Sequence, residues 1–323
     1  MKTRLGLIVM LAAMAVGTVA AVSEGWPAKT VRVIVPFGAG STPDLVARML
    51  ADQLQQKLNG TFVVENKPGA SGNIGTDLVA KAEPDGATLG VSIAGPLAIN
   101  TLLFSRLPYD PFRDIQPITV LATQPSVLAV PGSLGVNSVA ELVELLKREP
   151  GKYNYGSIGS GSVSQLAMEA IALKSGTRLV HVPYASSPQA VTALMRGDVQ
   201  MVCLPAISIV PQVKTGNIKM LAVTTAERFP LLPEIGTLRE AGIPGVESSA
   251  WMGLIAPSGT PAPVIDKIFR ETVEALHTPA MLDKLQTQLM LPVGNSPAEF
   301  TAELKAELAR WAPVIQAADI KIN

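Results

Sequence analysis

The sequence predicts an α/β protein with two lobes. Short β-branched strands alternate with amphipathic helices along most of the chain, a pattern typical of a parallel sheet covered by helices. This alternation starts twice, and a length of about 300 residues after the N-terminal segment also favours two domains. Hydrophobic residues make up 48% of the chain and charged residues 16%, so each domain can fill a core.

The N-terminal segment has the composition of a secretory signal peptide. Lys2 and Arg4 form a basic start, an apolar run over 5–16 follows, and small residues come next. The apolar run is about a dozen residues long, shorter than the ~20 that a membrane-spanning helix needs. We therefore expect export to the periplasm and cleavage within 20–23, and we assign residues 1–24 to the signal peptide. An uncleaved membrane anchor is the alternative.

Charge and cysteine content exclude several classes of protein. Loss of Lys2 and Arg4 reduces the 26 basic residues to 24, against 26 acidic residues, which leaves a net charge of −2. Nothing resembles the basic stripe of a nucleic-acid-binding protein. Cys203 is the single cysteine, so it can neither form an intramolecular disulfide nor act as an N-terminal lipoprotein anchor. We expect the mature protein to diffuse freely, with no nucleic-acid partner.

The first series of elements begins with a β-branched strand over 31–35. A loop of small residues separates this strand from a helix over 44–58, which Asn59 and Gly60 terminate. The series then alternates strand, helix and strand, which predicts a parallel sheet. The later elements are strands over 61–65 and 88–93 and a helix over 75–82.

The second series begins at a β-rich stretch over 118–130, which Gln124 and Pro125 interrupt. Ser138 and Glu141 have the spacing of a capping box at the start of a helix. A strand that ends at 156 leads into a second loop of small residues. The expected elements are helices over 138–148, 164–174 and 188–195 and strands over 179–182, 199–204 and 218–223.

The C-terminal part has one strand over 248–256 and then only helices. It has too few strands for a third sheet, so we expect it to pack on the first lobe. The expected helices cover 263–276, 279–288 and 297–316.

These elements predict how the chain is divided. Lobe one is expected to comprise residues 25–123 and 250–323, and lobe two residues 124–249. The chain would then cross between the lobes twice, near 120–128 and 245–253, and these crossings would form a hinge.

Each lobe contains one strand–loop–helix segment rich in small residues. The first covers 35–44 and the second 155–164. The N–H groups at a helix start lack partners and carry partial positive charge, and glycine lets a ligand approach them. Because ligands of open α/β sheets bind beyond the carboxyl ends of the strands, the two loops could clamp one anion. Alternatively, both loops are ordinary connections between a strand and a helix. Neither loop has a nucleotide-binding fingerprint, which disfavours a nucleotide as the ligand.

Asp44 lies at the start of the first long helix. As an acid in the first turn it would stabilise the helix by about 0.3–1 kcal/mol, and the sequence slightly favours this role. Alternatively, Asp44 would accept hydrogen bonds from the loop or bind a ligand hydroxyl, amine or water.

Residues suited to catalysis or metal binding are few. His181 lies in an apolar strand and His277 ends a helix, so they are expected to be a packed residue and a partner of the helix dipole. Cys203 is expected to be a small core residue. No G-x-S-x-G segment surrounds the loop serines, and no cluster has metal-ligand spacing. We predict no enzyme activity, cofactor or metal; a secreted hydrolase is the alternative.

Several short motifs follow one another in a fixed order over the mature chain. They are PAKTVRVIVPF over 27–37, Gly40 with Asp44, VENKPGASGNIG over 64–75, PDG over 84–86, IN over 99–100, LPYD over 107–110, YNYGS over 153–157 and HVPY over 181–184. This ordered set resembles the tripartite tricarboxylate transporter receptors, the Bordetella uptake gene (Bug) family of periplasmic solute-binding proteins.

The resemblance implies the type II periplasmic binding-protein architecture, an α/β fold of two lobes with a two-crossing hinge. Family members close around a carboxylate, partly through loop N–H groups and bridging waters, and deliver it to a membrane permease. The implied partners are therefore a small carboxylate and permease subunits, and the implied state is a monomer. The implied contacts are Ala39, Gly40, Ser41, Thr42 and Asp44 in lobe one and Ser157, Gly159, Ser160, Gly161 and Ser162 in lobe two.

The chain departs from the family pattern at several positions. Pro96 and Leu97 replace Thr-His, Gln165 replaces His, Ala185 and Ser186 replace Lys-Gly after Tyr184, and Leu204 and Pro205 replace Asp-Asn. If these positions line the cleft, its walls become less charged, and Tyr184 and Leu204 join the expected contacts. This favours a carboxylate with an apolar or aromatic body, such as terephthalate, over citrate or an amino acid. An aliphatic di- or tricarboxylate, or a role as partner of a sensor kinase, are the alternatives.

Overall fold

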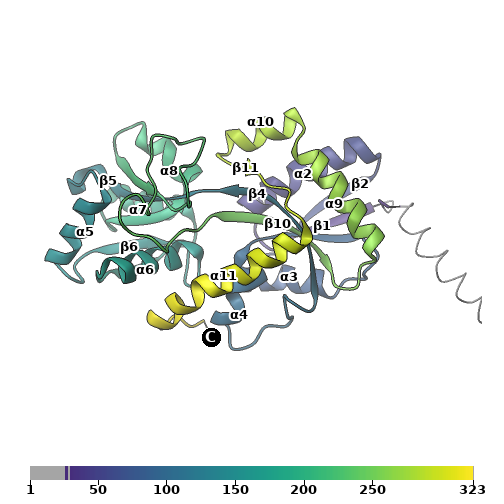
Figure 1. Cartoon of the computed structure of the whole chain (residues 1–323), viewed down its shortest axis with the longest axis horizontal. Coiled ribbons are helices and arrows are strands. Elements are labelled where there is room, and N and C mark those ends of the chain that lie inside the picture. Colours follow the sequence, from purple (N-terminus) through teal and green to yellow (C-terminus); the bar gives the residue numbers. More distant parts are fainter. Residues whose placement is uncertain (1–25, 28–29, 323) are drawn as a thin grey trace, which may run out of the picture.

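Two β-sheets form the centres of the two lobes (Figure 1). This computed structural model describes residues 26–27 and 30–322, so the predicted signal peptide lies outside the described residues. The lobe-one sheet has, in spatial order, β11 (Leu291–Pro292), β4 (Ile115–Gln124), β10 (Ala250–Pro257), β3 (Thr88–Ser92), β1 (Thr30–Val35) and β2 (Thr61–Asn66). The lobe-two sheet has β7 (Val180–Pro183), β6 (Asn154–Ser157), β8 (Met201–Pro205), β5 (Ser126–Pro131) and β9 (Ile218–Val223). The predicted two-lobed α/β fold is confirmed.

The middle strands β3 and β10 of the lobe-one sheet are buried on both faces, as expected for strands with few polar residues. Strand β1 pairs in parallel with β2 and β3, and β10 pairs antiparallel to β3 and β4. Val33 and Val35 pack against α2 (Thr42–Leu58) and α9 (Ala262–Leu276), whereas Ile34 belongs to the cluster on the opposite face. Helix α10 (Pro279–Thr287) packs on α2. Strand alternation thus directs neighbouring side chains of β1 into two different cores.

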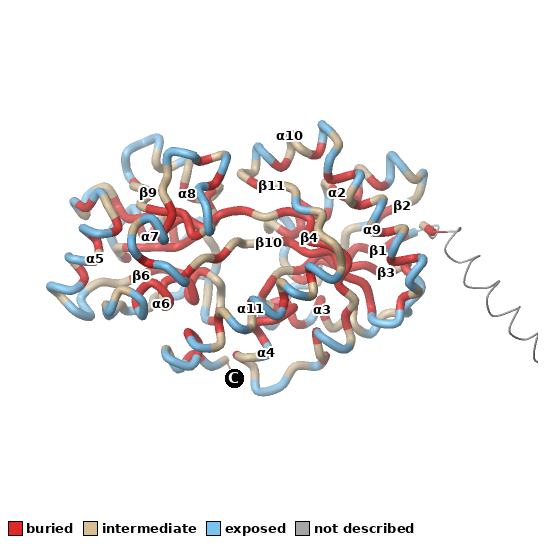
Figure 2. Tube along the Cα trace, viewed as in Figure 1, coloured by how far each residue is buried: buried red, intermediate tan, exposed pale blue. Residues whose placement is uncertain are grey.

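The lobe-two sheet also has helices on both faces. Val127 and Leu204 pack in a cluster with α7 (Ser187–Arg196) and α8 (Ala206–Val213), while Leu128 and Cys203 belong to the cluster that contains α5 (Val139–Arg148) and α6 (Val163–Ser175). Burial raises the pKa of the Cys203 thiol to about 12, in keeping with a small core residue. Figure 2 shows the buried residues concentrated along the strands of both sheets.

The cap at the start of α5 differs in detail from the predicted capping box. The Ser138 hydroxyl accepts the Glu141 N–H at 3.1 Å, as expected. The Glu141 carboxylate, however, accepts the N–H of Asn137 rather than that of Ser138. One half of the box is therefore present, and the other half is shifted by one residue.

Several elements were not predicted. They are η1 (Ala70–Gly72), the π-helical turn η2 (Gly95–Ile99), α4 (Asn100–Leu103), η3 (Gly132–Leu134), α8 and β11. Most are too short to display a clear hydrophobic period, and α8 contains Pro211, which normally argues against a helix. The helix predicted over 75–82 is present as α3 (Asn73–Ala80), and it begins and ends two residues earlier than expected.

The C-terminal helix α11 (Pro297–Ala317) contacts both lobes, which the sequence did not indicate. It packs against β4, η2 and α4 of lobe one and against α6 of lobe two (Figure 1). Phe300 and Trp311 on α11 lie in the same apolar cluster as Leu97 from lobe one and Leu166 from lobe two. The expectation that the tail packs on lobe one holds for α9 and α10 and was incomplete for α11.

The two strand connections between the lobes lie side by side. The chain passes from β4 to β5 at Pro125, and Ala250 at the start of β10 pairs with Gln124 at the end of β4. The lobe boundaries at 123/124 and 249/250 remain our assignment. In the part of the chain that the structure describes, no helix is long and apolar enough to cross a membrane.

Candidate ligand-binding site

The lobe-one loop (residues 36–44) connects β1 to the first turn of α2. Gly38, Ala39 and Gly40 are exposed, and a Cβ added at either glycine would meet no atom within 4 Å. Gly40 has a φ of +77°, a conformation that glycine adopts without the steric cost of a side chain. The backbone of this loop is therefore open to a ligand.

Asp44 holds the lobe-one loop in place from beneath, with a side chain that is only 2% exposed. Its carboxylate accepts the Gly40 N–H at 2.8 Å and the Asn66 side-chain amide at 2.8 Å. It also accepts Nε of Arg48 at 3.1 Å and lies 3.0 Å from Nη2 of the same guanidinium. Asn66 donates in addition to the Phe37 carbonyl at 3.0 Å. With four donors the carboxylate has reached its usual capacity, so a direct bond to a ligand would have to replace one of them.

The charge of Asp44 is stabilised by these donors. Burial by itself raises the pKa of a carboxyl, but the hydrogen bonds from Arg48, Gly40 and Asn66 outweigh it and hold the pKa of Asp44 below its usual value. Of the roles that the sequence left open, the contacts favour ordering of the loop.

The lobe-one loop offers unoccupied donors. The N–H groups of Gly40 and Ser41 bond to Asp44 and to the Gly38 carbonyl. Those of Gly38, Ala39 and Thr42 have no acceptor within residues 26–27 and 30–322. The Ser41 hydroxyl is buried and likewise has no partner in this described part of the chain. Three N–H groups and one hydroxyl can thus bind an anion at the positive end of α2.

The lobe-two loop (residues 157–164) connects β6 to α6, and most of its donors are already used. The Ser164 hydroxyl accepts the Ile158 N–H at 3.0 Å, and the Gln165 side chain accepts the Gly161 N–H at 2.7 Å. Ser162 caps α6 by accepting the Gln165 N–H at 3.4 Å, and its hydroxyl donates to the Gly159 carbonyl at 2.6 Å. The loop is therefore fixed by its own side chains before any ligand binds.

Ser157 and His181 form a pair that sequence reasoning did not join. The Ser157 hydroxyl lies 2.6 Å from Nε2 of His181 and 3.1 Å from the Gly159 N–H and carbonyl groups. The imidazole stacks on Tyr155, with ring centroids 5.0 Å apart. Parallel pairing of β6 with β7 places Tyr155 opposite His181, and this register could not be derived from the two separate segments.

The Ser157–His181 pair lacks the features of a nucleophile. Ser157 has no exposed surface, and its hydroxyl bonds within its own loop. Among the described residues, no carboxylate hydrogen-bonds His181 in the way that orients a catalytic histidine. The same part of the chain contains no group of three or more His, Cys, Asp or Glu side chains arranged to hold a metal.

The lobe-two loop touches lobe one at Gly161. This residue has a φ of +75°, and an added Cβ would lie 2.6 Å from Cδ1 of Leu103 and of Ile322. The Ile322 N–H in turn donates to the Leu103 carbonyl at 3.0 Å. We call this contact of Gly161, Leu103 and Ile322 the seam; it joins the loop to α4 and to the C-terminal residues.

The chain shares its sequence and fold with known receptors. The model of the tripartite tricarboxylate transporter family receptor matches residues 46–320. The chain is 32% identical over 323 residues to Protein BugT of Bordetella pertussis, with 99% of both chains covered. It belongs to this receptor family. Members of the family are periplasmic solute-binding receptors, as the motif pattern indicated.

Two solved structures resemble this tripartite tricarboxylate transporter receptor closely. One is R. palustris Rpa4515 with adipate, at a TM-score of 0.82 and 35% identity over 92% of this chain and 99% of that chain. The other is MatC (Rpa3494) from Rhodopseudomonas palustris with bound malate, at a TM-score of 0.78 and 30% identity, over 90% of this chain and 100% of that chain.

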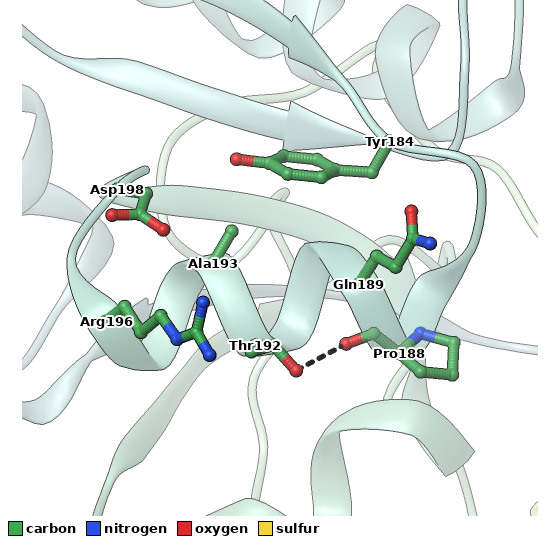
Figure 3. A pocket seen from close by; sticks show the side chains of 7 residues that line it. All are labelled: Tyr184, Pro188, Gln189, Thr192, Ala193, Arg196 and Asp198. Atoms are coloured by element: carbon green, nitrogen blue, oxygen red, sulfur yellow. Dashed lines mark hydrogen bonds between the residues drawn. The ribbon is translucent and has the colours of Figure 1, made fainter.

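Tyr184 and Leu204, the two further contacts expected in this receptor, lie in different surroundings. The Tyr184 ring lies over α7 and lines a cavity of about 400 Å³ (Figure 3). Its backbone N–H donates to the Ser157 carbonyl at 2.9 Å, which ties it to the lobe-two loop. Leu204 has no exposed surface and packs in the lobe-two core. The other residues of the cavity are Pro188, Gln189, Thr192, Ala193, Arg196 and Asp198.

The departures from the family pattern also lie in different surroundings. Leu97 is fully buried. Pro96 packs against Gly72, since a Cβ added at Gly72 would lie 2.7 Å from Cγ of Pro96. These two residues fill the core of lobe one rather than an exposed wall. Gln165 is buried too, but it contacts the lobe-two loop directly through the Gly161 N–H.

Proposed function

We propose that this receptor captures a small dicarboxylate with an apolar body in the periplasm and delivers it to a tripartite tricarboxylate-type permease. The observation that carries the proposal is the lobe-one loop. In this loop, whose exposed backbone Asp44 holds in place, three N–H groups and the buried Ser41 hydroxyl have no hydrogen-bond partner among the described residues. A carboxylate satisfies such donors without a cationic side chain.

The surroundings of the two loops suit an apolar spacer between two carboxylates. Ile158 in the lobe-two loop is 39% exposed, and Phe37 in the lobe-one loop is partly buried beside Gly72. The positive charge of Arg48 on α2 is already paired with the carboxylate of Asp44. Adipate in the relative Rpa4515 has two carboxylates on an aliphatic spacer, and terephthalate is the aromatic counterpart that the sequence favours.

The proposed contacts start from the residues expected from the sequence and add Gly38, and we infer two roles among them. Gly38, Ala39, Ser41 and Thr42 would bind the ligand, while Asp44 would act by ordering the loop. In lobe two, the exposed Ser160 and the partly exposed Gly159 are best placed, whereas Ser157 would act from behind the loop. Tyr184 remains a proposed contact, whereas Leu204 has no exposed surface and would support the site only from within the lobe-two core.

The proposal also covers export, the oligomeric state and the lack of enzyme activity. The segment 1–24 would direct the chain to the periplasm and be removed, and the mature receptor would act as a monomer without cofactor or enzyme activity. Binding by loop N–H groups requires only two lobes that close on the ligand.

Thermal-shift measurements with terephthalate, adipate, malate and citrate test the function. A ligand at 100 times its Kd should stabilise the folded protein by about 2.7 kcal/mol. We expect the largest shifts with terephthalate and adipate. No shift with any carboxylate would overturn the receptor proposal, and a shift with citrate alone would overturn the apolar spacer. Chromatographic analysis of each ligand after incubation should recover it unchanged.

A further inference from the structure

The hydrogen bonds of Ser157 can be arranged in two ways. In the first, the Ser157 hydroxyl donates to Nε2 of a neutral His181 and accepts the Gly159 N–H. In the second, Nε2 carries a proton and donates to the Ser157 oxygen, and the hydroxyl donates to the Gly159 carbonyl. The measured distances of 2.6 and 3.1 Å permit both arrangements. The proton position on His181 therefore decides which group of the lobe-two loop the serine binds.

The same carbonyl of Gly159 also supports the helix cap. It accepts the Ser162 hydroxyl at 2.6 Å and the Ser162 N–H at 3.3 Å. A change at Ser157 thus reaches Gly159, Ser160 and the start of α6, which form the exposed edge of the lobe-two loop. His181 itself need not touch a ligand to affect this edge.

We propose that His181 is a positioning residue of the lobe-two loop, which it holds through the Ser157 hydroxyl, and that carboxylate binding at this loop is coupled to protonation of His181. The inference rests on the proposed function, because it concerns the carboxylate site. Charge sets the direction of the coupling. A protonated imidazole behind the loop attracts the bound anion, and the bound anion in turn favours the proton.

Within the part of the chain that the structure describes, His181 forms no salt bridge. On its own face of the sheet, the imidazole lies against Tyr155 of β6, whose hydroxyl donates to Glu169 of α6 at 2.5 Å. Burial raises the pKa of Tyr155, so this residue stays neutral in the physiological range. Because β7 is the edge strand, no further strand lies beyond it. Burial also lowers the pKa of His181, which favours the neutral ring when no ligand is bound.

Binding of adipate and terephthalate to His181 variants, measured by calorimetry, tests the inference. His181→Leu removes the bond to Ser157 and should weaken binding about tenfold at pH 7.5, the usual effect of losing one such hydrogen bond. His181→Gln keeps a polar group within reach of Ser157 without a titrating ring, so its affinity should stay within about twofold of the original. His277→Leu is the matched control, because His277 is the only other histidine and bonds to Val273 on α9 in lobe one.

The pH dependence separates positioning from mere packing. Between pH 8 and 5.5 the original protein should gain about threefold in affinity relative to His181→Gln, because the bound carboxylate raises the pKa of His181 and favours its protonated form. The ratio of the two affinities cancels any titration of the ligand. With only two histidines, NMR of the imidazole protons in His277→Leu reports His181 alone, and the ligand should raise its titration midpoint.

The outcomes distinguish this inference from the proposed function. If the original protein binds none of the carboxylates, the proposed function fails. If it binds adipate or terephthalate but His181→Leu binds equally well, or the ratio to His181→Gln does not change with pH, only the role of His181 is overturned. Circular dichroism and thermal unfolding check that His181→Leu folds, and His181→Gln with the NMR titration decides the question if it does not.

Discussion

The lobe-one loop is held by a single buried carboxylate, whereas the lobe-two loop is held by several hydroxyl and amide groups. Asp44 alone receives donors from Gly40, Arg48 and Asn66. In lobe two, Ser162, Ser164 and Gln165 each bind one part of the backbone. The first arrangement leaves three N–H groups free, and the second leaves few.

This difference indicates a division of work between the lobes. A loop with free donors and an ordering anion beneath it can bind a carboxylate without rearrangement. A loop whose N–H donors are mostly satisfied can offer a carboxylate its hydroxyl groups, and its conformation depends on side chains behind it, such as His181. One substitution, at Asp44, should therefore destabilise most of the lobe-one loop, whereas each substitution in the lobe-two loop should have a smaller effect on stability.

The largest effect is expected from Asp44→Ala. The substitution removes the acceptor of the Gly40 N–H and one partner each of Arg48 and Asn66. It should lower the free energy of unfolding by about 3 kcal/mol. This value is at the lower end for a broken buried ion pair, because Arg48 is half exposed. Adipate binding should be lost as well. Urea unfolding and calorimetry measure the two effects. Asp52→Ala, on the same helix with a side chain 63% exposed, is the control and should change stability by less than about 0.5 kcal/mol. Equal effects would contradict the ordering role of Asp44.

The original protein should have a larger free energy of unfolding than Asp44→Asn at neutral pH, and acid should reduce this difference. Because the pKa of Asp44 is lower in the folded than in the unfolded chain, its contribution to stability is complete above the unfolded pKa of about 4. The contribution is lost as pH falls through the lower folded value. Urea unfolding between pH 3 and 7 should therefore show the two proteins converging only below pH 4. A constant difference over this range would mean that Asp44 does not act as an anion.

Glycine substitutions compare the two loops at the next level of effect. Gly161→Ala places a Cβ against Leu103 and Ile322 at the seam and adopts an unfavourable positive φ, so it should cost about 2 kcal/mol. Gly40→Ala has the same backbone strain but open space around it, and should cost about 1 kcal/mol. Thermal and urea unfolding of both variants measure the difference. If Gly40→Ala were the more destabilising of the two, the seam would not limit the position of the lobe-two loop.

The sequence predicted both loops, but only part of how they are held. Asp44 and Gly40 are four residues apart, so a loop-ordering role for the carboxylate could be considered from local spacing. The pairing of Ser157 with His181 spans 24 residues and depends on the parallel register of β6 and β7, which no local pattern specifies. The contact of α11 with both lobes depends on where a long amphipathic helix docks. Local rules fix caps and strand faces, whereas register and docking are settled by tertiary packing.

The smallest effect is expected from Ser162→Ala, which removes the cap of α6. The Gln165 N–H, the Gly159 carbonyl and the Ser164 hydroxyl would lose one partner each, and the usual cost of losing such a cap is about 1 kcal/mol. The Gly159 carbonyl keeps the Ser162 N–H, and neighbouring bonds through Ser164 remain, so the loop should stay folded. Ser160→Ala is the matched control in the same loop, because the exposed Ser160 side chain forms no hydrogen bond to the described residues. It should leave urea unfolding unchanged, even if it weakens adipate binding. A cost above about 2 kcal/mol for Ser162→Ala would show that lobe two, like lobe one, depends on a single group, and the contrast between the loops would disappear.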